Sequence, residues 1–212
     1  MTNILPINTK GHYSVKVDVL RNTKHLVEEE HYSKSVNGVK VSFVFSLWFK
    51  EELIGCVLYG QMATTAWKKF GQKESDVLEL RRLVIKRGYD RNINSWFVSK
   101  TIKFLKKHTE TKIIVSYADP YYSHRGYIYQ ALNFIYIGLS GTDKGYRDLD
   151  TGKTYHSRAL RTKYKGRYKP FVEELRKKLE AGELEEITLP GKHTYVFTLG
   201  KTFNFVKLPY PK

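Results

Sequence analysis

The sequence predicts an α+β protein in which one central mixed β-sheet is flanked by helices. Short runs of β-branched and aromatic residues, such as residues 41–50 and 53–60, alternate with segments of helical periodicity. Those two runs are joined at Lys50-Glu51-Glu52, which favours a hairpin-like connection. With 212 residues, 41% of them hydrophobic and 14% aromatic, the chain is long enough to bury a substantial core.

The N-terminal half is expected to form a strand, a short helix and then a meander of strands. Tyr13, Val15, Val17 and Val19 alternate with polar residues, which is typical of a half-buried strand. The expected elements are a strand at 13–20, a helix at 21–30 ending at His31, strands at 41–50 and 53–60, a loop at 61–76 and a strand at 78–85.

A basic loop, KRGYDRNINS at residues 86–95, follows the last of these strands and leads into a helix. We expect the N-cap of this helix at Asn94 or Ser95 and its end at the cationic turn around His108. Free amides at a helix start, together with positive charge, can hold phosphate. A solvated basic loop before an ordinary helix fits the local pattern equally well.

The stretch from residue 113 to residue 138 is the expected centre of the protein. Ile113, Ile114 and Val115 are typical of a buried strand, and Pro120 stops the strand because it cannot donate to a ladder. A polar loop, a short helix after Gly126 and a strand ending at Gly138 are expected next. Polar groups at the carboxyl ends of strands line ligand crevices, so we expect the active site at Asp119, Tyr121, Tyr122, Ser123 and His124.

The C-terminal part is expected to be a basic extension, residues 141–212, attached to a catalytic domain of residues 1–140. Residues 153–169 hold seven Lys or Arg and no acid, interleaved with tyrosines, a mixture that suits a nucleic acid. A helix is expected from Pro170, followed by a β-hairpin in which YVFTL and FNFVKL flank Gly200-Lys201. The expected DNA-binding residues are Arg158, Arg161, Lys163, Lys165 and Arg167.

The charge balance indicates a polyanionic partner. The formal net charge is +16 and the isoelectric point is near 9.7, which suits nucleic acid or an anionic membrane. No run reaches transmembrane length and the N-terminus lacks the pattern of a signal peptide, so we expect no membrane partner. The single Cys56 excludes an internal disulfide and a cysteine-based zinc site, which fits a reducing cytoplasm.

Four segments in this order resemble the bacteriophage Mom family of DNA adenine modification proteins: EEHYSKS at 29–35, ELRRLVI at 79–85, NINSWFVS at 92–99 and SYADPYYSHRGYIYQALNFIYIG at 116–138. The resemblance implies a fold like that of the GNAT acyltransferases. It also implies an enzyme that adds a carbamoylmethyl group to N6 of adenine in double-stranded DNA and so protects phage DNA from host restriction. Such a protein would act in the host cell cytoplasm.

The same resemblance implies the site residues. Tyr32, Arg82, Asp119 and Tyr129 match the catalytic positions, and Asp119 would be a general base or a metal ligand unless it only caps a turn before Pro120. Arg82 is preferred to its neighbour because successive strand residues face opposite ways, so only one of the two enters the crevice. The expected substrate-binding residues are His31, Tyr121, Tyr122 and His124.

The donor of the transferred group is left open by the sequence. The resemblance implies acyl-CoA, with acetyl-CoA as an example, held by Arg87, Gly88 and Ser95, but the glycine pattern of the acyltransferase loop is reduced to Arg87-Gly88. Iron is a second expected cofactor, with His31 and Asp119 as ligands. Two other functions fit the pattern: an ordinary GNAT N-acetyltransferase acting on a small amine or protein, and a non-catalytic DNA-binding module.

Overall fold

The computed structural model describes residues 6–63, 65–200 and 203–212, and these residues fold into two compact units. Unit 1 holds the described residues up to Ala118, Arg125–Gly138 and those from His193 onward. Unit 2 holds Asp119–His124 and Leu139–Lys192. The second unit is therefore an insertion within the first, and the chain returns to unit 1 at its C-terminal end.

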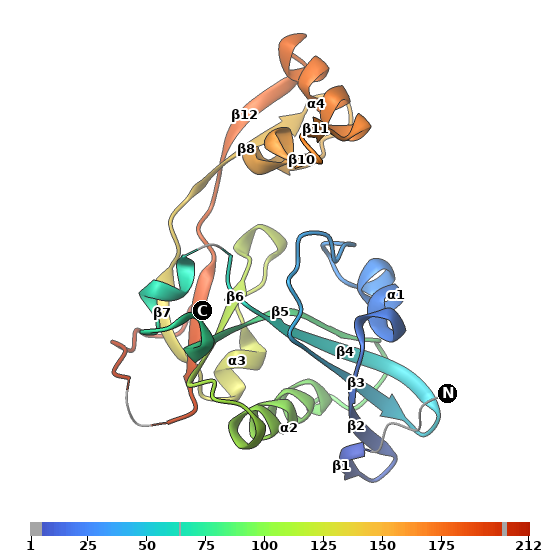
Figure 1. The fold of residues 1–212 in the computed structure, drawn as a ribbon, viewed down its shortest axis with the longest axis vertical. Helices are drawn as coiled ribbons and strands as arrows, with labels where there is room; N and C mark the ends of the chain where they lie inside the picture. Colours follow the sequence, from blue (N-terminus) through green and yellow to red (C-terminus); the bar gives the residue numbers. More distant parts are fainter. Residues whose placement is uncertain (1–5, 64, 201–202) are drawn as a thin grey trace. The chain divides into compact units, whose positions relative to one another are not determined.

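Unit 1 is built on an eight-stranded sheet, shown in Figure 1. β5 pairs with β6 in parallel, whereas β4 with β5 and β6 with β13 pair antiparallel, which makes the sheet mixed. In spatial order the strands are β1 (Pro6–Lys10), β2 (Tyr13–Asp18), β3 (Phe43–Phe49), β4 (Glu52–Gly60), β5 (Val77–Ile85), β6 (Ile113–Ala118), β13 (His193–Thr198) and β7 (Ile135–Leu139).

Helices cover both faces of this sheet. Leu26 and Val27 of α1 (Leu20–Glu30) pack with Val44, Cys56 and Leu58 on one face. The alternate strand residues, among them Phe45, Val57 and Tyr59, point to the other face because side chains alternate along a strand, and there they meet α2 (Ile93–His108) and α3 (Tyr127–Ala131). This three-layer arrangement is visible in Figure 1 and confirms the predicted fold class.

The ladder between β5 and β6 ends before either strand does. Their pairing runs from Val77↔Ile113 to Leu80↔Ser116, whereas β5 continues to Ile85 and β6 to Ala118. A β-bulge in β5 coincides with this point, because Leu58 pairs with Arg82 and Tyr59 with Leu80, which leaves Arg81 as the extra residue. The sheet is therefore interrupted at its centre, next to two of the segments singled out by sequence.

Unit 2 is built around a three-stranded antiparallel sheet in the order β12 (Leu184–Leu189), β8 (Asp143–Asp148) and β9 (Thr154–His156). The helix α4 (Pro170–Glu180) packs on it through Leu175, together with Leu160 of the 3₁₀ helix η4 (Ser157–Arg161) and Leu184. Between η4 and α4 lies a two-stranded hairpin, β10 (Lys163–Tyr164) and β11 (Arg167–Tyr168). The predicted helix from Pro170 is confirmed.

Two sequence-based expectations are wrong. The N-cap of α2 is Asn92, because a backbone bond from Ile93 N to Asp90 O of 2.9 Å closes a turn earlier than expected. The C-terminal hairpin does not form: β13 pairs with β6, and residues 203–212 carry no strand. Instead Leu208 N donates to Tyr136 O over 2.8 Å, and the expected turn residue Lys201 lies outside the described residues.

The extension also differs in extent from the expected residues 141–212, since unit 2 ends at Lys192 and β13 belongs to the main sheet. In the part of the chain that is described, no helix has the length and apolar character needed to cross a bilayer.

Candidate active site

In unit 1, the Tyr32 phenol influences the pKa values of Arg82 and Tyr129, and these three are among the four residues predicted to be catalytic. Arg82 belongs to β5, and its Nε donates to Ser35 O over 3.2 Å. Burial lowers the pKa of the Arg82 guanidinium, and the Tyr32 phenol acts in the opposite direction. Tyr32 also raises the pKa of Tyr129. Segments around residues 32, 82 and 129 therefore converge although they are far apart in sequence.

Tyr129 is held as a neutral phenol. Burial raises its pKa to about 12, and the influence of the Ser116 hydroxyl, on the last residue of β6 that pairs with β5, partly offsets this. A phenol with such a pKa remains protonated at neutral pH and can donate a proton. Tyr129 belongs to α3, and its ring packs 5.3 Å from the ring of Tyr195 and 5.4 Å from that of Phe134, which fixes its direction.

The two neighbouring arginines of β5 have different hydrogen-bond partners. Arg81 Nη1 lies 3.0 Å from Glu79 Oε2 and 2.9 Å from Gln61 O. Arg81 also lines a pocket of about 140 Å³ together with Lys40, Glu74 and other residues of that region. Arg81 therefore contacts Glu79 and Gln61, whereas Arg82 contacts Ser35, and the choice of Arg82 for the predicted crevice stays a prediction.

Two residues near this cluster were missed by sequence. Glu79 of β5 raises the pKa of both Tyr117 and Tyr129, although burial is the larger cause for each. Its only signal was an acid between two apolar residues of this strand, Leu78 and Leu80. His193 pairs with Ala118 across β13 and β6, so it lies at the carboxyl end of β6, and nothing in the local sequence marks that position.

His31 stacks near Tyr32, with ring centroids 4.2 Å apart, and is almost buried. Its Nδ1 accepts from Ser33 N over 3.0 Å, so that nitrogen carries a lone pair and Nε2 bears the proton of the neutral ring. The pair is positioned to present one aromatic face, that of Tyr32, which is 38% exposed. The substrate-binding role of His31 stays a prediction.

The fourth predicted catalytic residue, Asp119, follows β6 along the chain and is described within unit 2. Its Oδ1 accepts from Tyr121 N over 3.1 Å, which caps the short 3₁₀ helix η3 (Pro120–Tyr122), and its Oδ2 lies 2.9 Å from Lys192 Nζ. The structure therefore confirms that Asp119 caps the turn at Pro120, a role that the sequence had left open. A catalytic role for Asp119 stays a prediction, to be separated from the cap by substitution.

The loop after Asp119 gathers aromatic rings. The rings of Tyr121 and Tyr122 lie 5.2 Å apart and edge to face, and His124 lies 6.4 Å from Tyr122. Tyr121 and Tyr122 are 48% and 46% exposed, and Tyr121 is anchored by a 2.8 Å hydrogen bond between its hydroxyl and Thr154 Oγ1. Exposed, anchored rings of this kind can stack on nucleobases.

The loop between β5 and α2 fits a diphosphate. Gly88 has φ +95° and no atom within 4 Å of where a Cβ would stand, so a ligand can approach its backbone closely. The amides of Asn94 and Ser95 in the first turn of α2 bond to none of the described residues, and that turn holds no acid. Ser95 does not cap the helix: its Oγ donates to Asn92 O over 3.1 Å. Arg87 is exposed beside this backbone.

The described residues do not support the predicted iron site. Among the described residues, no three His, Cys, Asp or Glu side chains gather as metal ligands do. The two predicted ligands, His31 and Asp119, belong to different units.

The five residues predicted to bind DNA fall into two groups within unit 2. Arg158 lies 3.8 Å from Asp143, and Arg161 donates to Ser157 Oγ over 3.3 Å, so both contact the body of the unit. Lys163, Lys165 and Arg167 instead lie on the β10–β11 hairpin.

Comparison with known proteins agrees with this fold. The sequence model of the Mom protein family matches residues 12–212. A probable GNAT acetyltransferase from Chromobacterium violaceum is similar in structure, with a TM-score of 0.51 and 8% identity over 94% of this chain and 93% of the other. The IAA acetyltransferase from Bacillus cereus gives a TM-score of 0.51 and 9% identity over 88% and 99%. No curated protein matches by sequence.

Proposed function

The chain belongs to the Mom protein family, and we propose that it is a transferase that adds a carbamoylmethyl group to N6 of adenine in double-stranded DNA. The modification would protect phage DNA from restriction in the cytoplasm of the host. The observation that carries the proposal is the electrostatic cluster of Tyr32, Arg82 and Tyr129 where β5 and β6 part, since these are the residues that match the family's catalytic positions.

The reaction requires a proton acceptor, a proton donor and a group that stabilises negative charge. N6 of adenine is a weak nucleophile, so it must lose a proton as it bonds to the carbon of the transferred group. The bond from that carbon to its leaving group breaks at the same time, and the leaving group must be protonated or otherwise stabilised. Tyr129, whose pKa near 12 keeps it protonated, would give that proton, and Arg82 would stabilise the negative charge that develops.

Asp119 would accept the proton of N6, and Tyr32 would hold the adenine by stacking. Reaching N6 in a duplex favours extrusion of the base, at a cost of about a few kcal/mol of unstacking that contacts with aromatic rings offset. Tyr121 and Tyr122, which are also predicted to bind the substrate, are exposed.

The donor would bind at the β5–α2 loop. If it is an acyl-CoA, its diphosphate would meet the amides of Gly88, Asn94 and Ser95 and the side chain of Arg87, and the thioester would supply an activated acyl carbon. A thioester by itself transfers an acyl group rather than a carbamoylmethyl group, so the proposal names this loop as a binding site for an anionic donor and leaves the chemical identity of that donor to experiment.

The experiment is mass spectrometry of nucleosides from plasmid DNA of cells that express the protein. We expect a heavier deoxyadenosine with the intact chain and none with Asp119→Ala or Tyr129→Phe. The mass increase identifies the transferred group: a carbamoylmethyl group supports the proposal, whereas an acetyl group would redefine the reaction.

Unmodified adenine with the intact, folded protein, in cells of the phage's own host, would overturn the proposal. Two further assays then identify the alternative. Acetylation of amines by purified protein with acetyl-CoA and without DNA would mark an ordinary N-acetyltransferase. Salt-dependent DNA binding without any chemistry would mark a DNA-binding module.

A further inference from the structure

The β10–β11 hairpin of unit 2 has a geometry that the composition of the basic segment did not predict. Lys163 pairs with Tyr168 and Tyr164 pairs with Arg167, which leaves only Lys165 and Gly166 in the turn. Both have positive φ, +49° and +79°, as in the type I′ turn of tight hairpins. Such turns favour Asn-Gly, and a lysine at the first position has a conformational cost.

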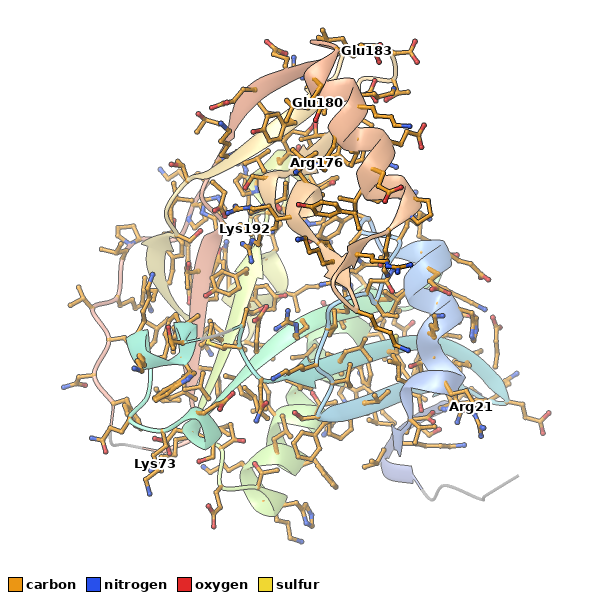
Figure 2. All side chains as sticks on the ribbon, turned by 45° about the horizontal axis from the view of Figure 1, so that its top comes forward. Arg21, Lys73, Arg176, Glu180, Glu183 and Lys192 are labelled. Carbon is orange, nitrogen blue, oxygen red and sulfur yellow. The ribbon has the colours of Figure 1, made fainter. Side chains whose placement is uncertain are left out.

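Cation–π contacts stiffen the base of the hairpin. Lys163 Nζ lies 4.8 Å from the centre of the Tyr168 ring, and Arg176 Cζ lies 4.8 Å from the same ring. Arg176 belongs to α4, where Figure 2 labels it together with Glu180. The hairpin is thus tied to the body of unit 2 at one end, while Arg167, which alternates with Tyr168 and faces the other way, is exposed.

The charge of unit 2 is distributed unevenly. Four of its acids, Asp143, Asp148, Glu185 and Glu186, form ion pairs, and their partners come from β8, β9, η4 and α4. No Asp or Glu occurs from residue 151 to residue 172. The hairpin therefore carries Lys163, Lys165 and Arg167 without a nearby acid in sequence, and Arg167 makes no ion pair with any described residue.

We propose that the β10–β11 hairpin enters the major groove of duplex DNA, with Lys165 at its tip. The major groove admits a two-stranded β-ribbon, whereas the minor groove of B-DNA, about 6 Å wide, is too narrow for one. The three cations would neutralise phosphates on both walls of the groove or bond to base edges. The proposal rests on the proposed function only in its choice of duplex DNA as the partner.

The test uses the full chain and a fluorescent duplex, with affinity measured by anisotropy at several salt concentrations. Lys165→Asn retains a residue suited to positive φ and removes the charge. We expect binding about 3- to 10-fold weaker, a salt slope that falls by about one, and unchanged or higher thermal stability. Lys50→Asn is the matched control, because Lys50 has φ +54° and lies in the β3–β4 turn of unit 1.

The groove is tested with two modified duplexes. Glucosylated hydroxymethylcytosine fills the major groove, and netropsin fills the minor groove of A·T-rich sequence. We expect the first to weaken binding of the intact protein and to have less effect on Lys165→Asn, and the second to have little effect on either. Unchanged affinity of Lys165→Asn, or competition by netropsin alone, would overturn the proposal.

The outcome of these DNA-binding measurements is independent of whether the protein modifies adenine. If adenine is modified but Lys165→Asn binds and modifies DNA as the intact chain does, the hairpin proposal fails and the proposed function stands. If the hairpin binds the major groove but adenine is never modified, the reverse holds.

Discussion

The hydroxyl of Tyr136 lies 2.9 Å from Nδ1 of His193, and this pair joins β7 to β13 at the level where β6 ends. Burial lowers the pKa of the His193 imidazole, and the positive charge of Arg125 lowers it further. His193 is therefore neutral at pH 7, with one ring nitrogen engaged by Tyr136.

The lowered pKa of His193 predicts how stability depends on pH. Because the folded protein binds this proton less readily than the unfolded chain, the contribution of His193 is present above the ordinary histidine pKa of about 6.5 and is lost as pH falls through the lower, folded value. His193→Asn should make the unfolding free energy, measured with urea between pH 7 and pH 5, less dependent on pH. His25→Asn, an exposed position on α1, is the control; equal slopes for both variants and the intact protein would contradict the assignment.

Tyr129→Phe should reduce modification strongly while leaving the fold intact. The substitution keeps the ring that packs on Phe134 and Tyr195 and removes only the hydroxyl. Loss of a general acid costs about 100- to 10,000-fold in rate, so modified adenine should fall below detection in a short time course. Tyr117→Phe, which removes another phenol with a pKa raised to about 12, is the control and should retain activity. A Tyr129→Phe protein as active as Tyr117→Phe would exclude Tyr129 as the acid.

The same two phenols predict behaviour at alkaline pH. Burial raises the pKa of Tyr117 and of Tyr129 to about 12 from the usual 10. Since the folded values are the higher ones, their stabilising contribution is complete below about pH 10 and is lost as pH rises towards 12. Unfolding followed by circular dichroism should coincide with late phenolate absorbance at 295 nm. If all tyrosines ionised near pH 10 with the fold intact, the assigned burial would be wrong.

Asp119 needs a pair of variants, because it caps η3 and binds Lys192 as well as carrying the predicted chemistry. Asp119→Asn keeps an oxygen for the Tyr121 amide and loses the charge, so we expect no modification and a stability loss of about 1 kcal/mol. Lys192→Met removes the ion pair and leaves the carboxylate, so it should retain activity. Equal losses of activity in both variants would mean that the ion pair, rather than a catalytic carboxylate, is what matters.

Much of unit 1 could be predicted because its signals are local. The turn at Lys50 and Glu51 marks the β3–β4 hairpin, and Pro120 marks the end of β6. The place of β13 could not be predicted, since a strand buried in the middle of a sheet looks the same whether its partner is the next segment or β6, which lies about 80 residues earlier. Strands β8 and β12 were missed because charged residues such as Lys144 and Glu186 occupy their exposed face and weaken the apolar alternation.

The arrangement of the candidate site could likewise be predicted only in part from the sequence. Resemblance supplied Tyr32, Arg82 and Tyr129, but their convergence depends on the bulge at Arg81 and on the end of the β5–β6 ladder, neither of which has a sequence signature. Glu79 and His193 are placed by strand register alone, so only the structure brings them to attention.

Gly126 is the position at which the loop before α3 tolerates no side chain. Its φ is +74°, and a Cβ added there would lie 2.4 Å from Cε2 of Tyr195, a ring that is fully buried against Tyr129 and Tyr136. Gly126→Ala should therefore cost about 2 to 4 kcal/mol of unfolding free energy, of which about 1 comes from the backbone and the rest from displacement of the ring. Gly38→Ala is the matched control, because φ is +72° there and nothing lies within 4 Å, so only the backbone cost should appear. Urea unfolding gives both values. Equal losses for the two variants would show that Tyr195 can move, and Tyr129, which packs on it, would then not be held as rigidly as a proton donor requires.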